Sequence, residues 1–510
     1  MSDAVSPARD DPRGPAAPEA PASLRSPAFV VVVAIQFVNV LANGSTTMAL
    51  PSIQSGLDAT SSDLQWFASV FALSFSMVLV LAGRLGDLFG ARRLLMIGYG
   101  LFVLAITLEG IAPGIYTLLA ARVLQGLAGG LMAPQLSAVI QRTYHGHSRT
   151  RAFAVYLTAA GAGFAVGQLL GGALMASDLW GLGWRWAFLP FVLPSLALWF
   201  VARRTVPHLE PEASGRLDVP GALMVGVVSI LVMFPLIKGR SVGWPVWIFV
   251  ILAAAVPVFV AFLSYQRRLV RSGGSPLVNP ELFRIRTFRV GNTITLLVGL
   301  IAAAVPLYLI LTVQIGFGKN PFQAALIACP MPLANMAGSL ATAPLLRHFG
   351  RLTIAIGAGC TALAAVAVLV AVSAGAGAVG VAALVPGFVL VGFALGISIA
   401  AAVAIVLSDI PASDSGSAAG VQSTGLQMSS AIGIAVYGVA FYGAVGGSDR
   451  LQPYLDGLVW VMWITIAFAA VQVLLMFGLP RHSAREQGEL PLADPELLVF
   501  PDLHGDVPSE

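Results

Sequence analysis

The sequence predicts an all-α membrane protein with 14 transmembrane helices, in two pseudo-repeated bundles of six with two helices inserted between them (6+2+6). Three observations support this prediction: the composition, the apolar runs and the distribution of positive charge. Only 10% of the 510 residues are charged, against about 25% in a soluble domain, and the mean hydropathy is +0.86. This composition excludes a soluble enzyme, a disordered protein and a nucleic-acid-binding protein.

Fourteen apolar runs are each long enough for a membrane-spanning helix, which needs roughly 17–25 residues. The runs must be helical because lipid offers the backbone no hydrogen-bonding partner. The expected spans are 27–49, 64–83, 94–113, 116–140, 152–175, 186–203, 219–237, 246–265, 288–313, 323–342, 352–373, 382–407, 417–443 and 457–479.

Positive charge alternates in density from one side of these spans to the other. With the N-terminus placed in the cytoplasm, five of the 28 Lys and Arg residues fall outside, Arg122 falls within a span and the other 22 fall inside. Cytoplasmic loops carry an excess of Lys and Arg. We therefore expect a multi-pass protein of the cell membrane with both termini in the cytoplasm.

A weak internal repeat divides the spans. Phe89-Gly90 follows the second span and Phe349-Gly350 follows the tenth, at matching places. Such repeats mark secondary transporters, whose substrate site lies between the halves near the membrane midplane. The expected parts are a disordered cytoplasmic tail at 1–26, an N-terminal six-helix bundle at 27–203, two inserted helices with cytoplasmic linkers at 204–287, a C-terminal six-helix bundle at 288–480 and an acidic cytoplasmic tail at 481–510.

The most specific motif is the connector after the second span. Its two glycines let neighbouring helices approach, and its Asp, flanked by arginines, can form and break ion pairs. This connector reads Gly83-x-Leu85-x-Asp87-x-x-Gly90-x-Arg92-Arg93. Two further patterns are Arg122-x-x-Gln125-Gly126-x-x-Gly129 in the fourth span and Gly163-x-x-x-Gly167-Gln168-x-x-Gly171-Gly172 in the fifth.

In this order the motifs resemble the major facilitator superfamily, and within it the fourteen-helix drug/proton antiporters of EmrB/QacA type. The resemblance covers roughly residues 27–480. It implies the major facilitator fold and proton-coupled efflux of hydrophobic drugs or secondary metabolites by alternating access, and with it antibiotic resistance. The residues to which it assigns gating are Gly83, Asp87, Gly90, Arg92 and Arg93.

The sequence departs from this branch at two places. The branch usually carries an Asp in the first span, where this chain has Ala42, and a Gly-Pro step in the fifth, where it has Gly167-Gln168. Because the usual carboxylate is missing, an uptake permease or facilitator on the same fold is an alternative. A non-transporting membrane sensor or scaffold is the alternative of another class, and would normally carry a folded soluble module.

Two charged residues within the spans are candidates for proton coupling. A charge as deep as Arg122 costs about 2.5–3.5 kcal/mol on insertion scales, so this residue should face the bundle interior and find a partner. Its alternative is a structural hub bonded to backbone carbonyls. Glu109 could bind and release a proton, but its position near Pro113 favours a boundary residue wetted by the outer headgroups.

Polar residues within the spans indicate a cavity. Gln36, Asn39 and Asn43 share one face of the first span by their i, i+3, i+7 spacing, and such a face is costly toward lipid. The further cavity candidates are Gln125, Tyr308, Gln422 and Gln427. The residues expected to permit close helix packing are those of the fifth-span motif, Gly163, Gly167, Gln168, Gly171 and Gly172. A cavity without carboxylates should favour neutral or weakly polar substrates over dications.

No enzyme activity, cofactor or metal site is expected. The six histidines lie in connectors or tails, and Cys329 and Cys360 lie in apolar runs without a CxxC pattern. The chain also lacks a phosphate-binding loop for ATP. The expected partners are therefore a small-molecule substrate, protons as the coupling ion and the lipid bilayer, with the protein as a monomer.

Overall fold

The structure is a computed structural model that describes residues 24–208 and 218–479, except 273, 275, 279, 374–379, 411–414 and 447–449. The expected acidic tail and most of the N-terminal tail lie outside the described residues, as does the side chain of Asp87. Within the described part, 14 helical segments are long and apolar enough to cross a membrane, which confirms the predicted number.

The helices follow one another in the order of the predicted spans. They are α1 (Pro27–Gly56), α2 (Ser61–Phe89), α3 (Ala91–Gly110), α4 (Ile115–Thr143), α5 (Gly146–Ser177), α6 (Leu189–Thr205), α7 (Val219–Lys238), α8 (Val246–Arg271), α9 (Arg286–Leu311), α10 (Pro321–Ala328), α11 (Pro330–Phe349), α12 (Leu352–Ser373), α13 (Val385–Leu407), α14 (Ser415–Val445) and α15 (Leu451–Met476).

The tenth span differs in shape from the prediction. A single helix was expected over 323–342, but two helices, α10 and α11, meet at Cys329. The reason is Pro330, which has no backbone N–H to continue the hydrogen-bond ladder and therefore interrupts a helix.

The two Phe-Gly pairs of the internal repeat have a shared structural cause. Gly90 ends α2 with φ 88°, and Gly350 ends α11 with φ 54°. Both values lie in the left-handed region, which glycine adopts without the steric cost that a side chain brings. A glycine with a positive φ thus ends the second span of each half.

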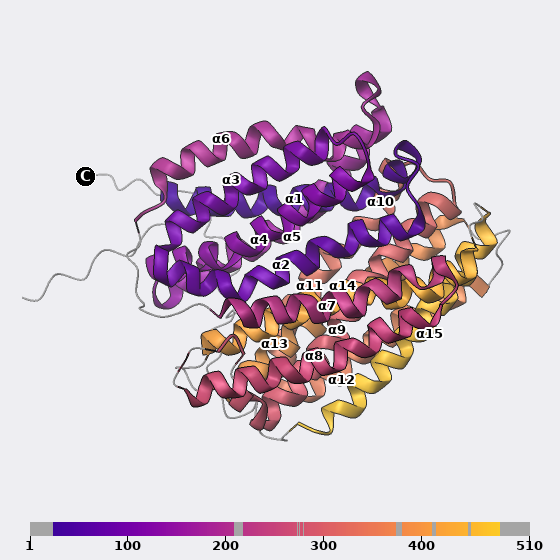
Figure 1. Cartoon of the computed structure of the whole chain (residues 1–510). Coiled ribbons are helices and arrows are strands. Elements are labelled where there is room, and N and C mark those ends of the chain that lie inside the picture. Colours follow the sequence, from indigo (N-terminus) through magenta and orange to yellow (C-terminus); the bar gives the residue numbers. More distant parts are fainter. Residues whose placement is uncertain are drawn as a thin grey trace, which may run out of the picture.

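Equivalent helices pack against one another in the two halves. In Figure 1 the helices run side by side along one direction, with α1–α6 gathered together and α9–α15 next to them. The packed pairs of the first half and their counterparts are α1–α5 and α9–α14, α2–α4 and α11–α13, α3–α4 and α12–α13, and α3–α6 and α12–α15.

The two additional helices, α7 and α8, pack against each other, and α7 also contacts α2 and α14. Ser229 of α7 lies against Met428 of α14, with Oγ 3.0 Å from Sδ. Gly226 of the same helix leaves room for the Met77 side chain of α2. Helix α7 therefore covers the seam between one helix from each half.

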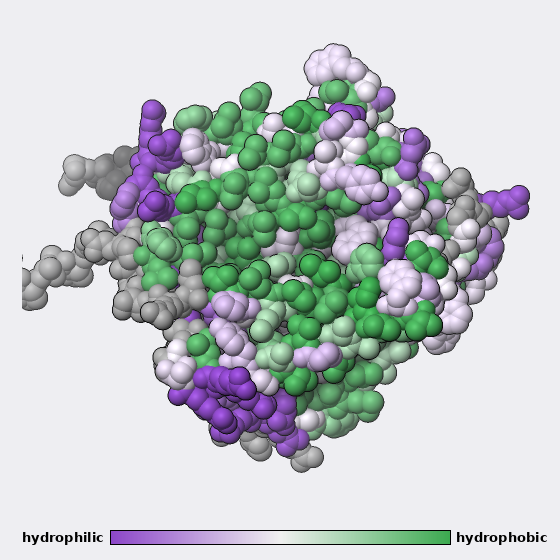
Figure 2. Space-filling view, in the orientation of Figure 1, coloured by the Kyte–Doolittle hydropathy of each residue, from purple (hydrophilic) through white to green (hydrophobic). Residues whose placement is uncertain are grey.

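The outer surface carries the apolar belt of a multi-pass membrane protein. Figure 2 shows hydrophobic side chains across the middle of the visible face, and hydrophilic side chains gathered toward the helix ends. Large apolar side chains exposed on α7 and α8 include Leu223, Val227, Ile230, Val250 and Val256. Lipid can cover such a surface without the cost that water would impose.

Candidate functional site

A cavity of about 490 Å³ lies between the two halves. Its wall comes from α1, α2, α4 and α5 on one side and from their equivalents α9, α11, α13 and α14 on the other. Across the halves, α2 packs against α14, and α5 packs against α10 and α11. The polar members of the wall are Asn43, Thr46, Thr47, Arg122, Gln168, Asn335, Gln427 and Ser430. The remaining wall residues are apolar or small, and they include Phe67, Phe71 and Phe164.

Several polar side chains of this wall bond to their own helix. Thr46 and Thr47 donate to the carbonyls of Ala42 and Gly44 at 2.8 and 2.7 Å. In the same way, Asn43 donates to the Asn39 carbonyl at 2.9 Å. Because their donors are already used within the helix, these groups make the wall less polar than the sequence implies.

Arg122 is the charged residue among the described residues that line the cavity. Its guanidinium lies over the rings of Phe67 and Phe71, 4.9 and 4.8 Å from their centroids. One of its nitrogens, Nη1, donates to Gln125 Oε1 and lies 3.7 Å from Glu109 Oε1. The structure thus provides the partner that a charge at this depth requires.

Glu109 is completely buried, so the expectation of a boundary residue wetted by headgroups is wrong. The helix pair α3–α4 encloses its side chain, because α4 turns back along α3 and brings Arg122 beside it. Neither carboxylate oxygen has a hydrogen-bond partner among the described residues. A second cation, Arg185, donates to the carbonyl of Ala112 at 3.1 Å. Ala112 follows Glu109 by three residues in the sequence.

The structure separates the other predicted cavity residues. Asn43 and Gln427 belong to the wall, whereas Gln36 and Asn39 of the same α1 face do not. Gln125 lies behind Arg122 and is fully buried. The remaining two serve contacts within the second half: Tyr308 donates to the Ile434 carbonyl at 2.6 Å, and Gln422 donates to Thr295 Oγ1 at 3.4 Å.

The glycines of the α5 motif lie where helices approach closely. A methyl group at Gly163 would come within 2.7 Å of the Phe37 carbonyl oxygen, and one at Gly167 within 2.8 Å of the Leu41 carbonyl carbon. Gly171 faces Ser45 in the same way, while Gly172 faces Pro321 of α10 in the other half.

The fifth member of that motif, Gln168, lies in the cavity wall. Sequence reasoning placed it among the packing residues and missed this location. The available signal was a long amide side chain within an apolar span, which needs a polar partner when it is buried.

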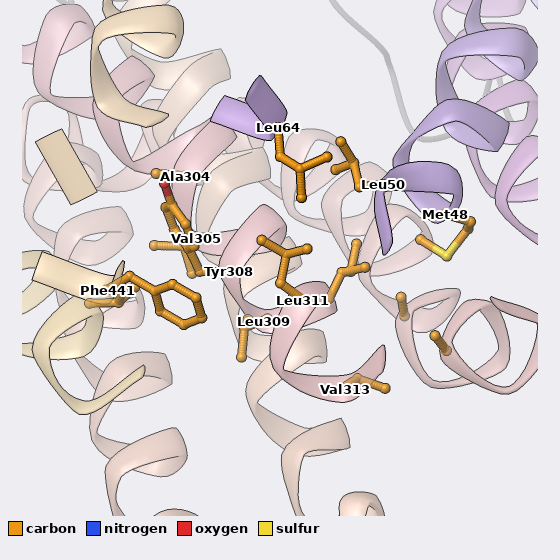
Figure 3. Close-up of a cluster of buried hydrophobic side chains, with 14 of the residues drawn as sticks. Met48, Leu50, Leu64, Ala304, Val305, Tyr308, Leu309, Leu311, Val313 and Phe441 are labelled. Carbon is orange, nitrogen blue, oxygen red and sulfur yellow. The ribbon is translucent and has the colours of Figure 1, made fainter. Parts of the chain in front are cut away.

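The cavity is closed at the end where α1 leads into α2, which the charge distribution predicts to be the outer side. An apolar cluster joins Met48, Leu50 and Leu64 of the first half to Leu309 and Leu311 of α9. Figure 3 shows these side chains in one cluster, with Tyr308 and Phe441 beside them toward the left. A polar contact also crosses the halves here, because Gln314 donates to the Met48 carbonyl at 3.3 Å.

At the opposite end lies the connector to which the resemblance assigns gating. Arg92 donates to the carbonyl of Arg203 and contacts His208 Nδ1, so it ties the start of α3 to the end of α6. Arg93 is exposed, and Gly83 has open space on the side where a Cβ would lie. The backbone of Asp87 belongs to the last turns of α2.

The sequence profile of the Major Facilitator Superfamily matches residues 32–434. The chain belongs to the major facilitator superfamily. As a member of this superfamily the protein is a transporter of small molecules rather than an enzyme.

Several relatives within the superfamily are similar along most of their length. A probable actinorhodin transporter of Streptomyces coelicolor is 32% identical over 85% of this chain and 75% of its own. A cephamycin export protein of Amycolatopsis lactamdurans is 30% identical, with 89% and 93% covered. A puromycin resistance protein of Streptomyces alboniger is 31% identical, with 88% and 89% covered.

Solved structures of the superfamily share the fold at low sequence identity. An auto-inhibited peptide transporter of the POT family superimposes with a TM-score of 0.64 at 14% identity, over 89% of this chain and 97% of its own. A bacterial homologue of the human lysosomal transporter Spinster gives 0.62 at 14% identity, over 88% and 95%. These matches establish the major facilitator fold.

Proposed function

We propose that this transporter exports hydrophobic small molecules, such as drugs or secondary metabolites, by alternating access in exchange for protons. The observation that carries the proposal is the mainly apolar cavity between equivalent helices of the two halves. A substrate bound there contacts both halves at once, so their relative movement can expose it to one side and then the other. The named exporters among the relatives support the outward direction.

In this proposal the apolar cluster at the outer side acts as a seal. Leu50, Leu64 and Leu311 belong to this cluster. Because the contacts between them are apolar, the seal can open without breaking a buried ion pair. The connector with Asp87, Arg92 and Arg93 works at the other end, where it holds the halves together while the outer side opens. The bundles 27–203 and 288–480 are the moving parts, and α7 and α8 accompany them.

The coupling step that we propose uses Glu109 and Arg122. An Arg stays protonated in proteins, so the exchanged proton resides on the Glu109 carboxylate. Protonation removes the negative charge beside Arg122 and leaves its guanidinium free to bind elsewhere in the cavity wall. Moving one charge across the membrane supplies about 2.3 kcal/mol per 100 mV, and a pH gradient adds to this.

Transport into inverted membrane vesicles tests the proposal. Vesicles with the full chain are offered a panel of neutral, cationic and anionic fluorescent compounds, with a proton gradient and after its collapse by an uncoupler. We expect gradient-dependent accumulation of neutral or weakly polar compounds. Transport that ignores the gradient would instead establish a facilitator, and vesicles that accumulate no compound under either condition would contradict export.

The same vesicles address orientation. With both termini cytoplasmic, a protease added outside inverted vesicles should remove the 481–510 tail, whereas right-side-out vesicles should protect it.

We further propose that the protein works as a monomer, which cross-linking in the membrane can test.

A further inference from the structure

Gln168 of α5 has hydrogen-bonding capacity that no described residue uses. Its side chain is fully buried in the cavity wall, and neither Oε1 nor Nε2 has a hydrogen-bond partner among the described residues. Leaving a buried polar group unpaired destabilises the folded protein. A group kept at that cost beside a cavity is a candidate for bonding to whatever enters the cavity.

Three hydroxyl side chains of the wall differ from Gln168 in this respect. The hydroxyl groups of Thr46, Thr47 and Ser430 donate to carbonyls of their own helices at 2.7–2.8 Å. These donors are occupied before a substrate arrives. The amide of Gln168 thus has a donor and an acceptor that no described residue occupies.

Helix packing fixes where the Gln168 backbone lies. A methyl group at Gly44 of α1 would come within 3.2 Å of the backbone nitrogen of Gln168, so the two backbones are held close together. Gly161, Phe164 and Gln168 all line the cavity, and their i, i+3, i+7 spacing puts them on one face of α5. Gln168 is therefore held on the face of α5 that borders the cavity.

We propose that Gln168 is a specificity-determining residue that hydrogen-bonds the substrate. A carboxamide has one acceptor oxygen and two N–H donors. Its complement is a substrate edge with an N–H or O–H group beside a C=O group, as in a lactam or an imide. The preferred class is thus a flat apolar molecule with one such edge, and this inference deepens the proposed export function, on which it rests.

Two probes that differ in one substituent on nitrogen can test this role. In 1,8-naphthalimide an N–H lies between two carbonyls on a flat aromatic body, and N-methyl-1,8-naphthalimide lacks that donor. Affinities of both probes are measured by fluorescence titration of the purified full chain in lipid nanodiscs. Gln168→Met keeps the length of the side chain without the amide. The matched control is Gln472→Met, since Gln472 of α15 is also buried with an unpartnered Nε2 but lies outside the cavity wall.

We expect the wild type and Gln472→Met to bind the imide roughly tenfold more tightly than its N-methyl derivative. Gln168→Met should bind both probes with the affinity that the wild type has for the derivative. A wild type that binds neither probe, or both equally, overturns the inference. A Gln168→Met variant that still discriminates between the probes also overturns it, because this result would indicate steric exclusion of the methyl group. A Gln168→Met variant that binds neither probe overturns it as well, because this result would indicate a packing role.

Vesicle transport of the same probes separates this inference from the proposed function. Gradient-driven accumulation of both probes without discrimination would overturn the role of Gln168 and leave export intact. Discrimination in binding without any gradient-driven transport would overturn proton-coupled export and leave the recognition by Gln168 intact.

Discussion

Arg122 Nη1 on α4 lies 3.7 Å from Glu109 Oε1 on α3, and the exposed fractions of the two side chains are 7% and 0%. Arg122 lines the cavity and Glu109 does not, so the guanidinium lies between the substrate space and the carboxylate. Arg122 Nε has no hydrogen-bond partner among the described residues. A change of charge on Glu109 therefore acts first on the guanidinium of Arg122, which borders the cavity.

Replacing Glu109 with Gln removes the carboxylate that we propose as the proton carrier. The variant should lose proton-driven accumulation, because the amide cannot exchange a proton, yet retain downhill substrate exchange. Inverted vesicles measure the first, and counterflow in proteoliposomes measures the second. Accumulation driven by the proton gradient that survives Glu109→Gln would refute Glu109 as the carrier.

Arg122→Ala should impair both accumulation and exchange. It leaves Glu109 buried without its counter-ion, and removing one partner of a buried charge pair costs about 3–5 kcal/mol. Arg122→Lys keeps the charge and should retain part of the exchange activity. Expression and the thermal-unfolding midpoint of each variant show whether the fold persists, and an Arg122→Ala protein with normal exchange would contradict a role in the cavity.

The α1–α5 contact should be sensitive to a single methyl group. Gly167→Ala places a Cβ within 2.8 Å of the Leu41 carbonyl carbon, and overpacking of this kind costs about 1–3 kcal/mol. The expected result is a lower thermal-unfolding midpoint of the purified protein. Gly359→Ala in α12 is the matched control, because nothing lies within 4 Å of the position that its Cβ would take. Equal midpoints for the two variants would argue against close packing at Gly167.

The spans could be predicted from the sequence because hydropathy is summed along each segment and does not depend on neighbours. The tenth span is interrupted at Pro330. This proline is visible in the sequence, but the continuous apolar run around it favoured the prediction of a single helix. The internal repeat could be detected in the sequence because each half requires a glycine with a positive φ at the matching place, Gly90 and Gly350.

The site depends on helix tilt and on contacts between distant segments, which periodicity does not provide. Gln36 and Asn43 share a face of α1, but only Asn43 reaches the cavity wall. Tyr308 has the residue type expected for ligand contact, yet its hydroxyl bonds to Ile434, 126 residues further along the chain. The burial of Glu109 required the return of α4 along α3, which places Arg122 beside it.

Asp87→Asn should reduce transport strongly while expression is maintained. The resemblance assigns this Asp to the contact that holds the halves together at the inner side, and the amide keeps the size of the side chain without its charge. Initial rates in inverted vesicles, normalised to the amount of protein, provide the measurement. Asp63→Asn is a suitable control, because Asp63 caps the first turn of α2 at the opposite end. Unchanged rates in Asp87→Asn would remove this connector from the gating proposal.

Substrate should protect cysteines placed in the cavity wall from aqueous thiol reagents. The background for this experiment replaces Cys329 and Cys360 with Ala, and single cysteines are then introduced at Asn43, Gln427 and Gln36. Asn43→Cys and Gln427→Cys should be protected, since the two positions belong to the wall on opposite halves. Gln36 lies seven residues before Asn43 on the same helix face, about 10 Å along the axis, and should be protected less.

Lys238→Cys at the end of α7 serves as the unprotected control. The comparison between Asn43 and Gln36 carries the most information, because the sequence alone predicts that both residues line the cavity. Full protection at Gln36→Cys would show that substrate extends two helical turns further toward the inner side than the cavity does. Equal labelling with and without substrate at both Asn43→Cys and Gln427→Cys would mean that the transported molecule binds somewhere other than between the two halves.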